Sequence, residues 1–211
     1  MRKILQFITD GTTSTEIISQ IKDAVSGGCR WVQIRMKHFS DKEIENVVES
    51  VLQFCRENGV CCIMNDRVDI AAKYQLDGVH LGREDMCVAE ARQILGDKAI
   101  IGMTANTIED ILLLSQQPIN YFGIGPMRFT VTKKNLSPSI GLSGYKEIIS
   151  FMNDTGICTP AVAIGGITCD DVHELLDIGL WGVAVSSAIA HAGNPKIATS
   201  RFLLEINKFN K

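Results

Sequence analysis

Short apolar runs alternate with longer amphipathic segments along the whole chain, and glycines stand at many of the junctions. An apolar run of four or five residues bounded by turn residues is typical of a strand, whereas apolar positions recurring every three or four residues are typical of a helix. The pattern therefore predicts eight strands, at Ile4–Ile8, Trp31–Arg35, Cys61–Asn65, Gly78–Leu81, Ile100–Thr104, Tyr121–Ile124, Ala161–Ile164 and Gly182–Val185.

Helices are predicted between and after these strands. They span Ser14–Val25, Asp41–Arg56, Val88–Leu95, Thr107–Leu114, Gly144–Phe151, Asp170–Ile178 and Ile197–Ile206, with a shorter one within Asp66–Tyr74. Strands that alternate with helices imply parallel strands joined by crossover helices, either in a closed eight-fold barrel or in an open doubly wound sheet. Because eight strands fit within only 211 residues, we predict a single-domain α/β fold, a (β/α)8 TIM barrel over residues 1–211.

Composition and charge narrow the range of partners. Hydrophobic residues make up 45% and charged residues 21% of the chain, as in an ordinary soluble globular protein. The formal net charge of -3 argues against nucleic acid or an anionic membrane surface as a partner. No apolar segment approaches the ~20 residues that a membrane span requires. We therefore expect a cytoplasmic protein with small-molecule partners.

The seven cysteines are scattered and show neither a CxxC pair nor the Cys/His spacing of a metal site. Several lie within apolar runs, where a cysteine behaves as a small buried hydrophobe in a reducing compartment. The spacing therefore predicts no structural metal.

In a barrel of this kind, chemistry takes place at the carboxyl ends of the strands. The second predicted strand leads into Gln33, Arg35 and Lys37, which strand alternation points to the same side. Two cations on an inward face are costly unless they hold an anion. This pattern favours a polyanion site, although an exposed strand end with Lys37 extended into solvent is the alternative.

Carboxylates follow the next two predicted strands. Asn65 and Asp66 close the third, and Asp85 lies a few residues beyond the fourth. Mg²⁺ commonly binds through one or two carboxylates together with substrate phosphates, so Asp66 and Asp85 are candidate magnesium ligands. The alternative is that both residues cap the helices that follow them.

Two further polar residues lie at strand ends. Thr104 closes the fifth predicted strand and places a hydroxyl at the rim, although a threonine bonded to its own backbone is the simpler interpretation. His80 lies in the fourth predicted strand, where a lone histidine is more often a hydrogen-bonded core residue than a catalyst.

Small residues mark the last two strand exits. Gly165 and Gly166 follow the seventh predicted strand, and Ser186 and Ser187 follow the eighth. Paired glycines let backbone amides approach an anion, and the loops after strands seven and eight are the usual phosphate site of these barrels. The pattern therefore favours a monophosphate site at Gly166, Ser186 and Ser187.

The segment from Gly125 to Lys134 follows the sixth predicted strand and combines turn residues with Thr130, Thr132 and Lys133. Turn residues bend the backbone, and hydroxyl and ammonium groups hold phosphate oxygens. This segment completes two anion-binding regions. One is the monophosphate site, and the other is a metal-assisted pyrophosphate site at Arg35, Lys37, Asp66, Asp85 and Lys133. The residues alone therefore predict a transferase or lyase with two phosphorylated substrates.

In this order along the chain, the motifs resemble those of the thiamine phosphate synthase family over nearly the full length. They are Ile8-Thr9-Asp10, Gln33-x-Arg35-x-Lys37, Asn65-Asp66, Gly78–Gly82 with Asp85, Gly102-x-Thr104, Gly125-Pro126 with Thr130-x-Thr132-Lys133, and Ile164–Ile167. The resemblance implies a TIM barrel that joins hydroxymethylpyrimidine pyrophosphate to thiazole phosphate, giving thiamine phosphate and pyrophosphate. It also suggests a homodimer.

The resemblance further implies a dissociative reaction, in which pyrophosphate leaves before the thiazole nitrogen attacks. Departure would be aided by Mg²⁺ on Asp66 and Asp85, and by Arg35, Lys37, Thr104 and Lys133. The pyrimidine or its pyrophosphate would contact Gln33 and Asn65. The thiazole phosphate would be held by Thr130, Thr132, Gly166, Ser186 and Ser187.

The chain departs from the family pattern in two places. Arg128 and Phe129 stand where the family commonly has an aromatic residue and then proline, which frees the loop and adds a cation. Position 104 is Thr where Ser is common, a change that keeps the hydroxyl. Two alternatives remain: a thiazole tautomerase of the same superfamily, which needs no pyrophosphate site, and a non-catalytic barrel that binds a phosphorylated ligand.

Overall fold

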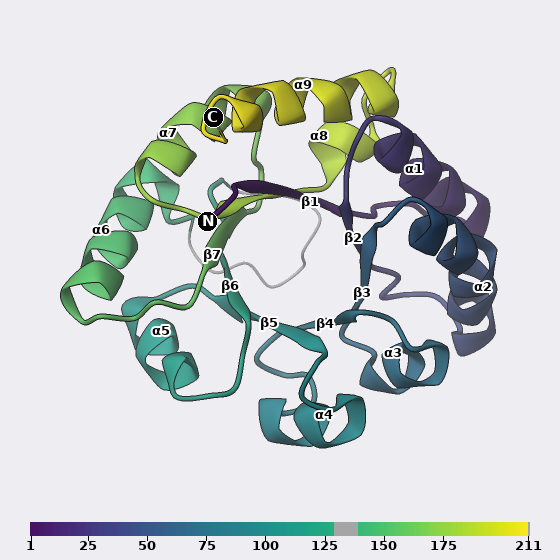
Figure 1. Ribbon diagram of the computed structural model, residues 1–211, viewed down its shortest axis with the longest axis horizontal. Helices are drawn as coiled ribbons and strands as arrows, with labels where there is room; N and C mark the ends of the chain where they lie inside the picture. Colours follow the sequence, from purple (N-terminus) through teal and green to yellow (C-terminus); the bar gives the residue numbers. More distant parts are fainter. Residues whose placement is uncertain (129–138, 211) are drawn as a thin grey trace.

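The computed structural model describes residues 1–128 and 139–210, and its strands form a closed parallel barrel (Figure 1). Each strand pairs with the next, and β8 pairs with β1. The strands are Ile4–Ile8 (β1), Trp31–Ile34 (β2), Cys61–Asn65 (β3), Gly78–Leu81 (β4), Ile100–Ala105 (β5), Tyr121–Ile124 (β6), Ala161–Ile164 (β7) and Gly182–Val185 (β8). The barrel prediction is confirmed, and the β1–β8 pairing excludes the open sheet.

Helices surround the barrel on its outer side (Figure 1). They are Ser14–Ser26 (α1), Asp41–Glu57 (α2), Val68–Tyr74 (α3), Val88–Leu95 (α4), Ile108–Ser115 (α5), Gly141–Asp154 (α6), Val172–Asp177 (α7), Ser187–Ala190 (α8) and Pro195–Asn207 (α9), with a 3₁₀ turn at Cys169–Asp171. Among the described residues, no helix is both long enough and apolar enough to cross a membrane.

The predicted elements agree with the structure, with a few differences at their ends. Strand β2 ends at Ile34, so Arg35 belongs to the following loop, and α6 begins three residues before the predicted Gly144. Helix α8 was not predicted, because its four residues are too few to show a helical period.

Capping boxes fix the starts of three helices close behind their strands. Thr13 caps α1 together with Glu16, and Ser40 caps α2 together with Glu43, each pair exchanging side-chain and backbone hydrogen bonds. Thr107 caps α5 in the same way. Such boxes satisfy the free amides of the first helical turn. The connections after β1, β2 and β5 are therefore short, and each strand end lies at the rim of the barrel.

The barrel interior is filled by side chains below the rim. This interior layer consists of Ile8, Trp31, Ile63, Tyr121, Val162 and Ala184. The rings of Trp31 and Tyr121 meet edge to face, with centroids 5.0 Å apart. A larger apolar cluster lies between the strands and the helices. The packed interior layer forms the floor on which a site at the rim can be built.

Two glycines make room for aromatic rings in this layer. Gly102 lies between His80 and Tyr121 in the strand register, and a Cβ there would lie 2.2 Å from the Tyr121 ring. A Cβ at Gly123 would lie 2.8 Å from Cε1 of His80. Because neither glycine carries a side chain, the two rings can approach each other across β5.

We predict that Gly102→Ala lowers the free energy of unfolding by about 1–3 kcal/mol, since the new methyl group would displace a fully buried ring. Urea unfolding of the two proteins would measure the difference. Gly193→Ala is the control, because no atom lies within 4 Å of its added Cβ, and we expect a change within about 0.5 kcal/mol. Equal effects of the two substitutions would contradict the packing argument.

Candidate active site

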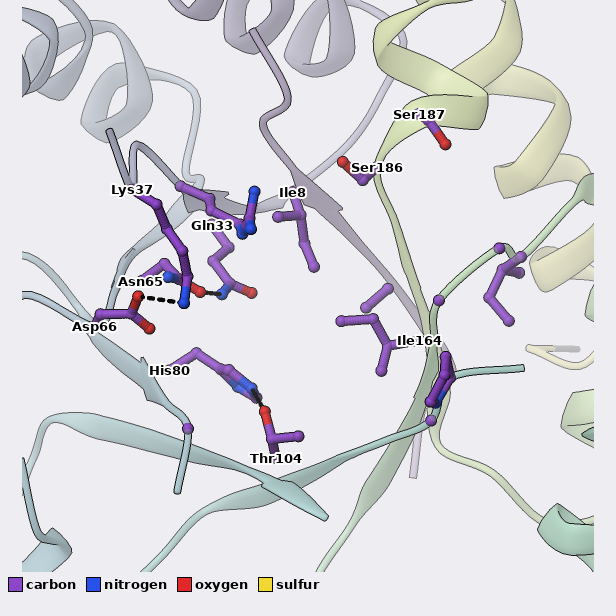
Figure 2. A pocket seen from close by; sticks show the side chains of 18 of the residues that line it. Ile8, Gln33, Lys37, Asn65, Asp66, His80, Thr104, Ile164, Ser186 and Ser187 are labelled. Carbon is purple, nitrogen blue, oxygen red and sulfur yellow. Dashed lines mark hydrogen bonds and ion pairs between the residues drawn. The ribbon is translucent and has the colours of Figure 1, made fainter. Parts of the chain in front are cut away.

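One pocket at the carboxyl ends of the strands is lined by every predicted site residue that the structure describes (Figure 2). These residues are Gln33, Arg35, Lys37, Asn65, Asp66, Asp85, Thr104, Gly166, Ser186 and Ser187. The remaining three predicted site residues, Thr130, Thr132 and Lys133, lie outside the described residues. Barrel closure thus brings together groups that are up to about 150 positions apart in the chain.

A cation and two carboxylates form one side of the pocket. Nζ of Lys37 lies 3.1 Å from Oδ2 of Asp66 (Figure 2). Burial and the neighbouring Asp85 carboxyl raise the pKa of Asp66, and the Lys37 ammonium offsets part of this increase. Asp85 is held in place because its Oδ2 accepts a 2.6 Å hydrogen bond from the amide of Gly82. The two carboxyl groups therefore repel each other unless a proton or a cation lies near them.

Neither carboxylate caps a helix, so the helix-capping alternative is wrong. Helix α3 has Arg67 at its N-cap position and α4 has Cys87, and neither helix has a side-chain capping bond. Asp66 instead adopts a left-handed backbone conformation with φ of 65°. A non-glycine residue in this conformation is uncommon and is found mostly where surrounding structure enforces it.

The two carboxylates fit a magnesium ion that also takes oxygens from substrate and water. Among the described residues, no group of three or more His, Cys, Asp and Glu side chains could hold a metal by itself. Mg²⁺ does not need such a group, because it usually keeps several waters and binds one or two carboxylates plus phosphate oxygens. The mutual repulsion of Asp66 and Asp85 is the feature that a divalent cation would relieve.

An amide pair lies beside the carboxylates. Nε2 of Gln33 donates a 2.7 Å hydrogen bond to Oδ1 of Asn65 (Figure 2). Oε1 of Gln33 and Nδ2 of Asn65 are buried and have no hydrogen-bond partner within the described part of the chain. The pair therefore presents one acceptor and one donor to the pocket. Rotating both amides would exchange the two roles but leave one of each.

Thr104 and His80 are hydrogen-bonded to each other. Nε2 of His80 lies 3.0 Å from Oγ1 of Thr104, and Nδ1 lies 2.9 Å from the Tyr121 hydroxyl. The expectation that Thr104 bonds to its own backbone is therefore wrong. His80 is a buried, hydrogen-bonded residue as predicted, at 4% exposure, and it also lines the pocket.

The opposite side of the pocket carries the glycine-rich loop and the two serines. Figure 2 shows Ser186 and Ser187 across from Lys37, with Ile8 between them and Ile164 below the serines. Gly165 and Gly166 both have positive φ, and a Cβ at Gly165 would lie 2.6 Å from that of Pro126. This side therefore offers backbone and hydroxyl groups rather than charged side chains.

Arg128 links this glycine loop to Asp171 through hydrogen bonds. Its guanidinium contacts both Asp171 carboxylate oxygens at 2.5 Å and donates to the Gly166 carbonyl at 3.0 Å. Burial tends to raise the pKa of Asp171, but the bonds from Arg128 and Thr168 hold it below its ordinary value. The charge that Arg128 adds to the sequence is thus paired with Asp171.

The pocket also contains residues that sequence analysis missed. Asn106 lines it and donates through Nδ2 to the Gly125 carbonyl, and Ile8 and Ile164 supply apolar surface. Asn106 lies two residues after Thr104, so strand alternation was a signal that could have indicated it. The two isoleucines were placed in strands and in the family motifs, but no role in a pocket was assigned to them.

A closed eight-stranded barrel with cations, carboxylates and a glycine loop around one pocket is the architecture of a TIM-barrel enzyme. A family model described as thiamine monophosphate synthase matches residues 5–189. The chain therefore belongs to the thiamine monophosphate synthase family.

Individual relatives match over nearly their whole length. Thiamine-phosphate synthase of Bacteroides fragilis is 46% identical over 199 residues, which cover 94% of this chain and 98% of the relative. Thiamine-phosphate synthase of Methanobrevibacter smithii is 34% identical, with 98% and 96% covered. Among solved structures, thiamine phosphate pyrophosphorylase from Pyrococcus furiosus is similar with a TM-score of 0.84 at 30% identity, covering 97% of this chain and 96% of that one.

The charges around Asp66 predict opposite effects of two substitutions on its pKa. Asp85→Asn should lower the pKa of Asp66, because a like charge is removed, whereas Lys37→Met should raise it, because a favourable cation is removed. Carbon-13 NMR titration of the Asp66 carboxyl would measure both changes. Shifts in the same direction would contradict the arrangement.

Proposed function

We propose that this barrel transfers the (4-amino-2-methylpyrimidin-5-yl)methyl group of 4-amino-2-methyl-5-hydroxymethylpyrimidine pyrophosphate to 4-methyl-5-(2-hydroxyethyl)thiazole phosphate, or to its carboxylated form. The products are thiamine phosphate and pyrophosphate, with CO2 in addition when the carboxylated form is used. The observation that carries the proposal is the Gln33–Asn65 amide pair directly beside the Lys37–Asp66 ion pair. The relatives named thiamine-phosphate synthase support the same reaction.

The amide pair matches one edge of an aminopyrimidine. That edge presents an exocyclic amine, which donates, next to a ring nitrogen, which accepts. Oε1 of Gln33 would accept from the amine, and Nδ2 of Asn65 would donate to the ring nitrogen, so both unpartnered amide atoms would be satisfied. An unsatisfied buried polar atom costs about 1–3 kcal/mol, so the pocket favours a ring edge that presents one donor beside one acceptor.

Departure of the pyrophosphate is the step that needs help from the protein. The bond between the methylene carbon and oxygen breaks, and both electrons leave with the pyrophosphate. Arg35, Lys37 and the Thr104 hydroxyl line the pocket where this charge would develop, and Lys133 is proposed to join them. Asp66 and Asp85 would hold Mg²⁺, which when bound screens the charge of the leaving group.

Bond formation then requires little further chemistry. The aminopyrimidine ring stabilises the positive charge on the methylene carbon, and the lone pair of the thiazole nitrogen forms the new bond to that carbon. No proton is removed from the thiazole, so no nucleophile–base pair is required. Electrostatic stabilisation of the leaving group and correct placement of the second substrate account for catalysis.

The thiazole phosphate is proposed to bind on the glycine and serine side. The amides of Gly166 and its neighbours can approach phosphate oxygens because no side chain intervenes, and Ser186 and Ser187 add hydroxyl groups nearby. Thr130 and Thr132 are proposed to complete this site. Ile8 lies between the two anion regions, with Ile164 below the serines (Figure 2), and the apolar faces of the two rings would meet beside these side chains.

The cation and carboxylate side argues against the tautomerase alternative, and turnover distinguishes the synthase from a non-catalytic barrel. A thiazole tautomerase needs no pyrophosphate site, yet this pocket keeps Lys37, Asp66 and Asp85. A barrel that only binds a ligand would bind thiamine phosphate without turnover. We also propose action in the cytoplasm, because the substrates are small charged metabolites, and a homodimer as the family resemblance suggests.

We predict that the purified protein, given both substrates and Mg²⁺, forms thiamine phosphate with one equivalent of pyrophosphate. Asp85→Ala should lower kcat by at least about 100-fold, since it removes a group that would hold the metal, while thiazole phosphate affinity changes less than about threefold. Chromatographic product analysis and calorimetry would measure these quantities. Asp97→Ala, at an exposed position, is the matched control. If the folded wild-type protein forms no thiamine phosphate under these conditions, the synthase proposal is contradicted.

We predict strong discrimination against a pyrimidine pyrophosphate in which hydrogen replaces the amine. In that analogue no group can pair with the unpartnered amide atom of Gln33, whichever way the two amides are turned. Its kcat/KM should be lower by about 10³-fold or more. Replacing Gln33 with Met should reduce this discrimination. Equal use of both pyrimidines by the wild-type protein would contradict the proposed recognition.

A further inference from the structure

A chain of hydrogen bonds crosses the barrel interior and ends at the pocket. It runs from Gln6 on β1 to Tyr121 on β6, then to His80 on β4, and then to Thr104 on β5. Nε2 of Gln6 lies 3.0 Å from the Tyr121 hydroxyl, which lies 2.9 Å from Nδ1 of His80. Nε2 of His80 lies 3.0 Å from Oγ1 of Thr104 (Figure 2). Of the four, His80 and Thr104 line the pocket, whereas Gln6 and Tyr121 do not.

The strand register explains how these four side chains meet. His80, Gly102 and Tyr121 occupy one row across three neighbouring strands, and Thr104 is paired with Gly123 in the next. The Tyr121 ring lies over Gly102, and the His80 ring lies over Gly123. Both rings are therefore confined by backbone as well as by hydrogen bonds, so the imidazole cannot rotate freely.

The hydrogen bond between Gln6 and Tyr121 sets the donor-to-acceptor direction of the whole series of hydrogen bonds. In the orientation that the structure gives the Gln6 amide, its nitrogen faces the phenol, and because this nitrogen can only donate, the Tyr121 oxygen accepts from it. The phenol proton then needs its own acceptor, and Nδ1 of His80 is in position to accept it. With the Gln6 amide in this orientation, the opposite direction would leave the phenol proton without an acceptor among the described residues, at a cost of about 1–3 kcal/mol. Burial also raises the pKa of Tyr121, which keeps the hydroxyl protonated.

The same donor-to-acceptor direction extends through His80 to Thr104. If Nδ1 of His80 accepts, the neutral imidazole has its proton on Nε2, and that proton is donated to Oγ1 of Thr104. The threonine oxygen then accepts from below, and its own proton is directed to another acceptor. We propose that His80 and Tyr121 are positioning residues that make the Thr104 hydroxyl a hydrogen-bond donor to the leaving pyrophosphate oxygen.

This proposal rests on the proposed function, but its first test does not. In protein labelled with nitrogen-15 at histidine, two-bond proton–nitrogen correlation spectra distinguish a protonated from an unprotonated ring nitrogen. We expect His80 to show an unprotonated Nδ1 and a protonated Nε2. A proton on Nδ1 would overturn the proposal, whether or not the protein makes thiamine phosphate.

Kinetics provide the second test. Tyr121→Phe should lower kcat by about 10–100-fold, because the Thr104 donor is no longer fixed toward the developing charge, with the pyrimidine substrate KM changed less than about threefold. Thr104→Val should cause a loss at least as large, and Thr104→Ser should restore activity to near the wild-type level. The Tyr121→Phe/Thr104→Val double variant should be no slower than Thr104→Val alone, because both substitutions act through one hydroxyl.

Tyr145→Phe is the matched control. Tyr145 is equally buried, and its hydroxyl donates to the Ile124 carbonyl at 2.8 Å rather than to the chain that ends at Thr104. It should lose a similar amount of stability and keep its kcat. A purely structural role for the interior bonds predicts equal kinetic effects for the two tyrosine variants, or additive losses in the double variant, and either result would overturn the proposal.

Discussion

Closure of the sheet by the β1–β8 pairing is the constraint on which the pocket depends. Parallel strands all end on the same side, and a closed ring of such ends surrounds a common centre. Gln33 from β2 and Ser186 after β8 can face one pocket only because β1 joins both neighbours. An open sheet of the same strands would place its first and last loops at opposite edges.

The pocket separates its charges in a way that suits two different anions. Ionised side chains gather after β2, β3 and β4, whereas the loops after β7 and β8 offer backbone and hydroxyl groups. A group with several negative charges gains most from the first environment, and a monophosphate can be held by the second. The apolar surface of Ile8 lies between them, where uncharged rings can pack.

Much of this arrangement could be predicted from the sequence, because in a closed parallel barrel the order of the strands along the chain fixes where the end of each strand lies. Once eight strands were recognised, any polar residue at a strand exit had to lie near the others, and Gln33, Asp66 and Ser186 did so. The partners of individual side chains could not be predicted. Thr104 meets a histidine 24 positions away and Arg128 an aspartate 43 positions away, and no local pattern encodes such pairs.

The glycines under the two interior rings carry a consequence for how such a barrel can change. Gly102 with Tyr121, and Gly123 with His80, each fill a fixed volume together, so neither member of a pair can be replaced independently. A methyl group on the strand demands a smaller side chain on its neighbour, and a smaller ring leaves a void. Transfer of this pocket to another barrel would therefore require the two strand glycines, Gly102 and Gly123, as well as the polar residues at the rim.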